Sequence, residues 1–138
     1  MGTVFLSTFA NPIDSTFAFA SLAGTVTSTT SVTAAEAWDR NAFTMPGGCT
    51  FNSMYVTAAA VDQTYVAANA LTYTLYKNNV ATSVILSLNA PTSLSAPTST
   101  SATGFSVPVV TGDKLAIGLT QTNGANSALW NLVTLRCQ

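Results

Sequence analysis

The sequence predicts an all-β protein, an antiparallel sandwich or barrel of about eight to ten short strands. Two observations predict this class. Apolar and polar residues alternate along several short segments, and Gly, Pro and Asn separate those segments at fairly regular spacing. A helical period is confined to one short stretch, so helices are expected to contribute little to the fold.

The alternation is clearest in three segments. Leu71, Tyr73 and Leu75 are separated by single Thr residues, and the same pattern recurs over residues 84–88 and 115–119. A half-buried strand has this period because successive side chains point to opposite faces of a sheet. The further candidate strands are rich in Thr, Val, Tyr and Phe, which fit a pleated surface. They are residues 3–9, 16–22, 24–32, 50–59, 104–109 and 129–137.

Turn residues divide the candidate strands. Asn78-Asn79 predicts a hairpin, because Asn tolerates the positive φ of a tight turn. The Thr-Gly-Asp sequence at residues 111–113 predicts a second hairpin. The Ser-, Thr- and Pro-rich residues 89–103 are expected to form a long loop. The helix-forming residues 33–39 span at most about two turns, so they are expected to be a connector.

Length and composition predict one domain over residues 1–138, with residues 1–22 either its first strands or an N-terminal anchoring arm. Of the 138 residues, 48% are hydrophobic, so material for a core is ample. Charged residues make up 7% and the net charge is −1, whereas an ordinary soluble domain has about 25% charged residues. A surface with so few charges suits a protein covered by neighbours in an assembly better than one diffusing alone.

Charge and hydropathy exclude several classes of partner. The four Lys and Arg residues are spread along the sequence and offer no phosphate-binding patch, so no nucleic acid is expected. No apolar run approaches the roughly 18 residues of a membrane span. No basic residue precedes the apolar N-terminal run, as one would in a signal peptide. We therefore expect a soluble protein made in the cytoplasm, without a membrane partner.

The sequence contains no recognisable set of catalytic residues, metal ligands or cofactor-binding residues. Histidine is absent, so Ser-His-Asp and Cys-His arrangements cannot form. Glu36 and Asp39 could approach the spacing of a glycosidase pair, but solvated charges beside Arg40 are the favoured interpretation. For Cys49 and Cys137, two separate buried thiols are the favoured interpretation in a reducing cytosol, and a disulfide between them is the alternative. Neither an enzyme nor a cofactor is expected.

Aromatic residues concentrate near the N-terminus, which indicates either a first strand or a segment that docks on a partner. Candidate interface residues are Val4, Phe5, Leu6, Phe9, Phe17, Phe19 and Trp38. An exposed Trp38 or Tyr65 could instead stack on a sugar. Tyr73 and Trp130 lie inside strand patterns, so core packing is expected for both.

Three segments resemble jelly-roll domains associated with tailed bacteriophages. The first is residues 43–56 (FTMPGGCTFNSMYV), which resemble the apolar-Pro-Gly-small entry into a strand of these domains. The second is residues 71–82 (LTYTLYKNNVAT), which resemble their strand T-L-Y-K-N-G-x-x-T. The third is residues 107–119, which resemble their hairpin V-x-x-G-D-x-L. The match covers residues 43–119 and consists of structural turns. It departs from the pattern at Asn79, where glycine is usual, and in the longer loop after Leu88.

The resemblance implies a jelly-roll-like antiparallel β-sandwich and a structural protein of the virion. Similar domains occur as capsid decoration, or cement, proteins and as trimeric receptor- or carbohydrate-binding heads of tail fibres. A fibre head normally carries its shaft, so the short chain favours the cement protein. Such a protein would bind the major capsid protein on the outside of the assembled head and bridge neighbouring subunits. Its self-association as a homodimer or homotrimer is also expected.

Overall fold

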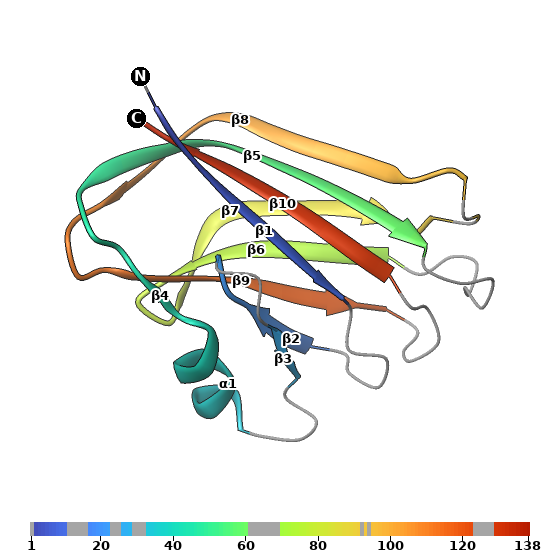
Figure 1. Cartoon of the computed structure of the whole chain (residues 1–138), viewed down its shortest axis with the longest axis horizontal. Helices are drawn as coiled ribbons and strands as arrows, with labels where there is room; N and C mark the ends of the chain where they lie inside the picture. The colour runs from blue at the N-terminus through green and yellow to red at the C-terminus, as the bar shows by residue number, and fades with distance from the viewer. Residues whose placement is uncertain are drawn as a thin grey trace.

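The fold consists of two antiparallel sheets packed face to face, as the alternating pattern predicts. The computed structural model describes residues 2–10, 17–22, 26–28, 33–60, 70–91, 93, 95–122 and 129–138. Sheet A has the strand order β1 (Thr3–Ala10), β10 (Leu129–Cys137), β5 (Cys49–Ala60) and β8 (Thr98–Val109). In Figure 1 it lies in front of sheet B, and the two chain ends lie side by side.

Sheet B is the larger of the two. Its order is β3 (Val26–Ser28), β2 (Phe17–Ala20), β9 (Lys114–Gln121), β6 (Ala70–Lys77) and β7 (Val80–Asn89), and β4 (Phe43–Thr44) also pairs with β9. Every pairing in both sheets is antiparallel. The expected all-β, jelly-roll-like sandwich is therefore confirmed. Within residues 1–22, β1 and β2 are strands of the two sheets, as one of the two alternatives expects, and an anchoring role for this segment stays a prediction.

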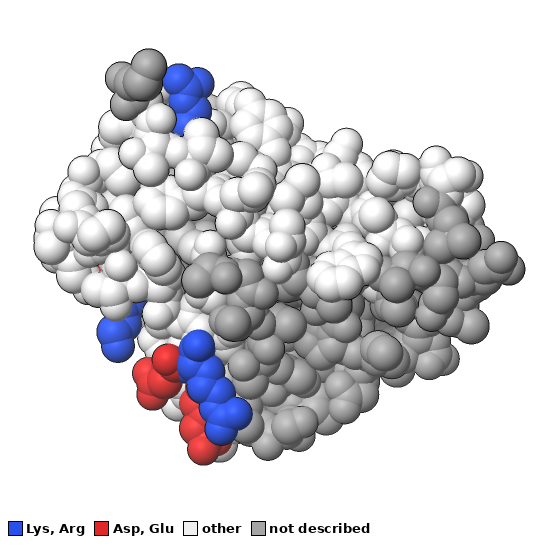
Figure 2. Space-filling view, in the orientation of Figure 1, with Lys and Arg blue, Asp and Glu red and all other residues white. Residues whose placement is uncertain are grey.

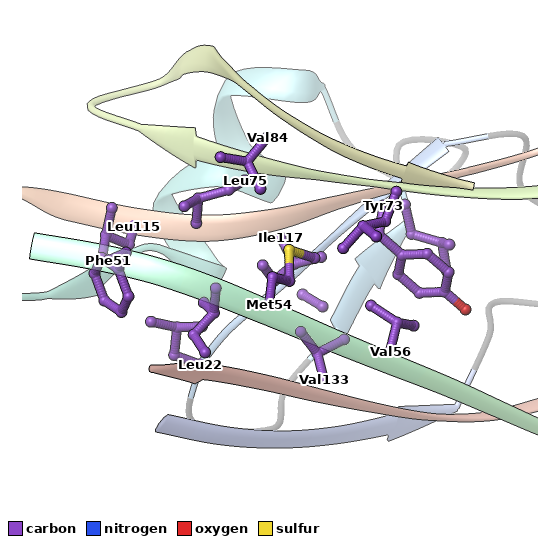
Figure 3. Close-up of a cluster of buried hydrophobic side chains, with 14 of the residues drawn as sticks. Leu22, Phe51, Met54, Val56, Tyr73, Leu75, Val84, Leu115, Ile117 and Val133 are labelled. Atoms are coloured by element: carbon purple, nitrogen blue, oxygen red, sulfur yellow. The ribbon is translucent and has the colours of Figure 1, made fainter. Parts of the chain in front are cut away.

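The core lies between the inner faces of the two sheets. Met54, Val56 and Val133 project from sheet A toward Leu75 and Ile117 of sheet B (Figure 3), and all five side chains are at most 1% exposed. Each such side chain stabilises the fold by about 1.5–3 kcal/mol through removal from water. The core therefore uses the inner half of each alternating strand and leaves the outer half free for other contacts.

Polar groups inside the core have partners. Tyr73 is fully buried, as expected, and its hydroxyl donates a hydrogen bond to the side-chain oxygen of buried Asn131. Burial raises the pKa of Tyr73, so this hydroxyl stays neutral and remains a donor. The buried Ser7 hydroxyl donates to the carbonyl of Ser21 at 2.5 Å, which ties β1 of sheet A to the chain just after β2.

The two predicted hairpins are present and their turns interlock. Asn78 and Asn79 have φ values of 51° and 64°, which a tight hairpin turn requires. Asn78 Nδ2 donates to Asp113 Oδ1 at 2.7 Å, and Lys77 Nζ lies 3.0 Å from Asp113 Oδ2. Hydrogen bonds to its carboxylate lower the pKa of Asp113 to about 2, and the bond donated by the N–H of Val110 is the main cause. Residues of the two predicted hairpins thus hold their turns together.

The expected connector helix is α1 (Ala34–Asn41). Thr33 begins it with a capping box, in which its hydroxyl accepts from the N–H of Glu36 and the Glu36 carboxylate accepts from the N–H of Thr33. These bonds, chiefly the one from the Thr33 backbone, lower the pKa of Glu36. The Glu36 carboxylate therefore has a structural role at the start of the helix.

Two sequence predictions about this fold are wrong. The expected loop over residues 89–103 is shorter, because β8 begins at Thr98 and pairs with β5 up to Ala58. Cys49 and Cys137 form a disulfide rather than two separate thiols. The antiparallel pairing of β10 with β5 brings their Cα atoms within 5.7 Å although 88 positions separate them.

Candidate functional site

The outer face of sheet A is the candidate functional site. Burial alternates along its strands, and the pairing of the strands brings the outward residues together into one surface. We call this surface the outer face; its residues are Val4, Leu6 and Thr8 of β1, Trp130, Leu132, Thr134 and Arg136 of β10, Ser53, Tyr55, Thr57 and Ala59 of β5, and Ser99, Ser101 and Thr103 of β8.

Large apolar and aromatic side chains on this face are open to solvent. The exposed fractions are 58% for Val4, 59% for Leu6, 49% for Tyr55, 54% for Trp130 and 38% for Leu132. Single exposed apolar residues are ordinary, but a contiguous patch of them marks a contact surface. Hydroxyl side chains fill the positions between them, so the polar groups of the face are mostly uncharged, and each hydroxyl needs a hydrogen-bond partner when the face is covered.

Charge is nearly absent from the outer face. Among its residues only Arg136 is charged, and it lies near the chain ends on the last strand. Figure 2 shows the same distribution: blue and red side chains gather over α1, and the surface over β1, β10 and β5 is almost entirely white. Covering a surface of this kind avoids most of the cost of desolvating charges, which is much larger than that of desolvating hydroxyls.

A shallow groove crosses one end of the outer face. Its volume is about 450 Å³, and its lining comes from β1, β5, β10 and the residue before β8. The lining residues are Thr8, Thr57, Ala59, Pro97, Trp130, Asn131 and Leu132. The groove is large enough for a bulky side chain, and no charged residue lines it.

The predicted interface residues are divided between three places. Val4 and Leu6 lie on the outer face, as a contact role requires. Phe5 points the other way, because it lies between them on the strand, and its ring packs 5.8 Å from that of Phe43. The backbone of Phe9 belongs to β1, but its side chain lies outside the described residues.

The remaining candidates form a second apolar cluster on the other side of the molecule. Phe19, Trp38 and Ala116 are buried together where α1 covers sheet B, and Phe17 and Tyr76 pack against them. Phe19 is 3% exposed and Trp38 5% exposed, so their prediction as interface residues is wrong. The Phe19 and Trp38 rings, 5.5 Å apart and edge to face, hold the helix on the sheet.

The residue that sequence reasoning missed is Trp130, which was expected in the core. Along β10 the core side of the strand is taken by Leu129, Asn131 and Val133, so Trp130 points outward. A two-residue period shows that a strand has two faces but does not say which one is buried. Leu129 could have indicated this orientation. It is apolar and begins a run in which every second residue up to Cys137 lies on one face, so Trp130 lies on the opposite face.

The acidic side chains and cysteines in the described part of the chain do not gather as metal ligands would. No group of three or more His, Cys, Asp or Glu side chains is placed to hold a metal ion there. Asp14 and Asp62 lie outside the described residues, as does Tyr65. The longest described helix, α1, has eight residues, which is too short to cross a membrane.

No protein-family model matches the chain, and no curated protein matches its sequence. Among solved structures the chain is similar to a family 35 carbohydrate binding module from Clostridium thermocellum, with a TM-score of 0.39 and 7% identity over 68% of this chain and 65% of that one. It is similar to infectious bursal disease virus Gx strain, with a TM-score of 0.38 and 14% identity over 99% of this chain and 32% of that one. Dimeric latent PorU from Porphyromonas gingivalis gives a TM-score of 0.37 and 10% identity over 97% and 10% of the two chains.

The chain spans less than two thirds of the length of each of these structures. TM-scores below 0.5 do not establish a common fold, so a function has to be argued from the residues of this chain and the surface they form.

Proposed function

We propose that the protein is a structural protein of a virion, a cement protein that binds the outside of the assembled phage head and bridges major capsid protein subunits. Its work is contact with other protein chains rather than a chemical reaction. The observation that carries the proposal is the outer face of sheet A, a nearly uncharged surface of exposed apolar and hydroxyl side chains.

The size of the outer face suits a protein interface. From Trp130 to Arg136 the strand rises about 20 Å at roughly 3.4 Å per residue, and four strands span about 19 Å. With the side chains at its margins the footprint is about 500 Å², or about 1,000 Å² counted over both partners, which is the lower limit for a specific protein interface. Apolar area covered there would contribute roughly 25 cal/mol per Å² before the costs of association.

The sequence motifs are what support a role in a virion. The motifs at residues 71–82 and 107–119 resemble those of phage jelly-roll domains, and the interlocked turns give them a physical reason. On a capsid, the modest contacts that each copy makes are repeated at every lattice position, and repetition turns weak contacts into strong retention. A surface with few charges is suited to such a crowded lattice, where most of it is covered.

The test is the copy number of the protein in purified particles. Quantitative mass spectrometry of virions from cells that carry the gene should find the chain at an abundance comparable to that of the major capsid protein. Particles from a gene-deleted strain should lack it and should bind purified protein added back. Absence from the head, or an abundance as low as that of a tail-fibre protein, would contradict the proposal.

A second candidate function is a carbohydrate-binding head, and one observation favours it. Trp130 and Tyr55 expose aromatic rings on a flat sheet face, and such rings stack on sugars. The outer face offers hydroxyls but no carboxylate or amide side chain to hold the sugar hydroxyls, which is why this candidate comes second. Binding of the purified chain to a glycan array, lost in Trp130→Ala, would favour this function over the cement protein.

A further inference from the structure

We infer that a second copy of this chain covers the outer face of sheet A. The two copies would stack face to face about a twofold axis that lies in the plane of contact, runs across the strands and passes between Leu132 and Thr134. Two sheets packed in this way form the same arrangement as the two layers of a sandwich, about 10 Å apart. The inference rests on the proposed function in one respect, that another protein chain covers this face, and it identifies that chain as a second copy of the same protein.

The pairing register of sheet A arranges the outer face in four rows across the strands. The first row holds Trp130 and Ala59; the second holds Thr8, Leu132, Thr57 and Ser99; the third holds Leu6, Thr134, Tyr55 and Ser101; the fourth holds Val4, Arg136, Ser53 and Thr103. Bulky and small side chains therefore exchange places between the second and third rows.

The proposed axis lies between the second and third rows and superposes each on the other. Leu6 of one copy then faces Thr8 of the second copy, and Tyr55 faces Thr57. In β10, the same rotation brings Leu132 opposite Thr134. Large side chains meet small ones at each of these positions, which is how packed layers interdigitate. The Tyr55 ring would extend into the groove of the second copy, where Thr57 and Thr8 form part of the lining.

The same axis superposes the first row on the fourth, so that Arg136 of one copy faces Trp130 of the other. A guanidinium over an indole ring is a favourable cation–π contact, and the geometry would form it twice. The two Arg136 side chains lie at opposite ends of the interface, about 20 Å apart along the strands. An axis along the strands would instead place both at the same end, where like charges repel.

A twofold dimer also supplies what a bridging protein needs. The face used for dimerisation lies on sheet A, so the surfaces of sheet B and α1 remain available on both copies. The outer faces of the two B sheets would point in opposite directions, so a capsid met along the twofold axis would contact the same sheet edge of both copies, one copy on each of two neighbouring subunits.

The test is sedimentation equilibrium of the purified full chain over a wide range of concentration. The unsubstituted protein should be a dimer, and Trp130→Ala should raise its dissociation constant by about 30-fold, as loss of a hot-spot side chain does. Leu132→Asp and Thr134→Lys should each give monomers, and an equimolar mixture of the two should give a heterodimer. The matched control is Ile85→Asp, because Ile85 is 57% exposed on sheet B and its substitution should leave the dimer intact. Fluorescence of buried Trp38 shows that each variant is folded.

The possible results separate the inference from the proposed function. A monomeric unsubstituted chain, a dimer unaffected by Leu132→Asp, or equal disruption by Ile85→Asp would overturn the inference. If the chain is monomeric and Trp130→Ala abolishes binding to gene-deleted particles, the capsid covers the face and the inference is wrong, although the proposed function stands. If the dimer forms as described but never binds the particles, the inference stands and the proposed function falls.

Discussion

Reduction of the Cys49–Cys137 disulfide should strongly destabilise the protein. The bridge closes a loop of 88 residues, and the chain-entropy relation for that length gives about 4.6 kcal/mol at 25 °C. This is an upper value, because residual structure in the reduced unfolded chain lowers the entropy that opening the bridge releases. We expect a loss of about 3–4.5 kcal/mol in the free energy of unfolding.

Urea unfolding with and without a phosphine reductant measures this loss. For a dependence on urea of about 2 kcal/mol per M, the midpoint should fall by roughly 2 M. Trp38 is a suitable probe because its ring is buried against Phe19 and becomes exposed on unfolding. In the control, a variant with both Cys49→Ala and Cys137→Ala should show no further change with reductant. An unchanged midpoint in fully reduced protein, or two thiols that react in the native oxidised protein, would refute the reasoning.

Three further predictions concern single residues. Gly118→Ala should lower the free energy of unfolding by about 1–3 kcal/mol, because the added Cβ would lie 2.5 Å from a ring carbon of Tyr76. Its control is Gly47→Ala, whose Cβ meets nothing within 4 Å and which should be neutral in the same urea assay. Asp113 should stabilise the fold above its ordinary pKa of 3.8 and lose that contribution as pH falls toward its folded pKa of about 2, so acid unfolding curves of Asp113→Asn should be flatter in this range. Asn79→Gly should raise the unfolding temperature, because Asn79 has a φ of 64° that glycine adopts without strain, with a gain of up to about 1 kcal/mol; a lower unfolding temperature would contradict this.

The strands could be predicted from the sequence because the core uses one side of each. Leu71, Tyr73 and Leu75 repeat every second residue, and all three are fully buried. The start of β8 could not be predicted in this way. Ser99 and Ser101 face outward on an edge strand, so its composition is that of a loop although its backbone is paired.

The candidate site could be predicted only in part, because tertiary pairing decides which residues it contains. Val4 and Leu6 were found through their apolar character near the chain start, but Trp38 has the same character and is covered by its own helix packing. Trp130 required the strand register to be known. The disulfide was missed for the same reason, since only the pairing of β10 with β5 brings Cys137 to Cys49.

The two sheets differ in how their outer faces are treated, and this difference supports a contact role. Over the part of sheet B that contains β2 and β9 the chain supplies its own cover, since α1 buries Trp38 on Phe19 and Ala116. On sheet A, Trp130 and Leu6 remain more than half exposed although stability does not require them there, because the inner faces already provide the core. A sandwich needs only polar or small residues at such outward positions. Bulky apolar residues that contribute nothing to the core are best explained by a surface that another protein chain covers.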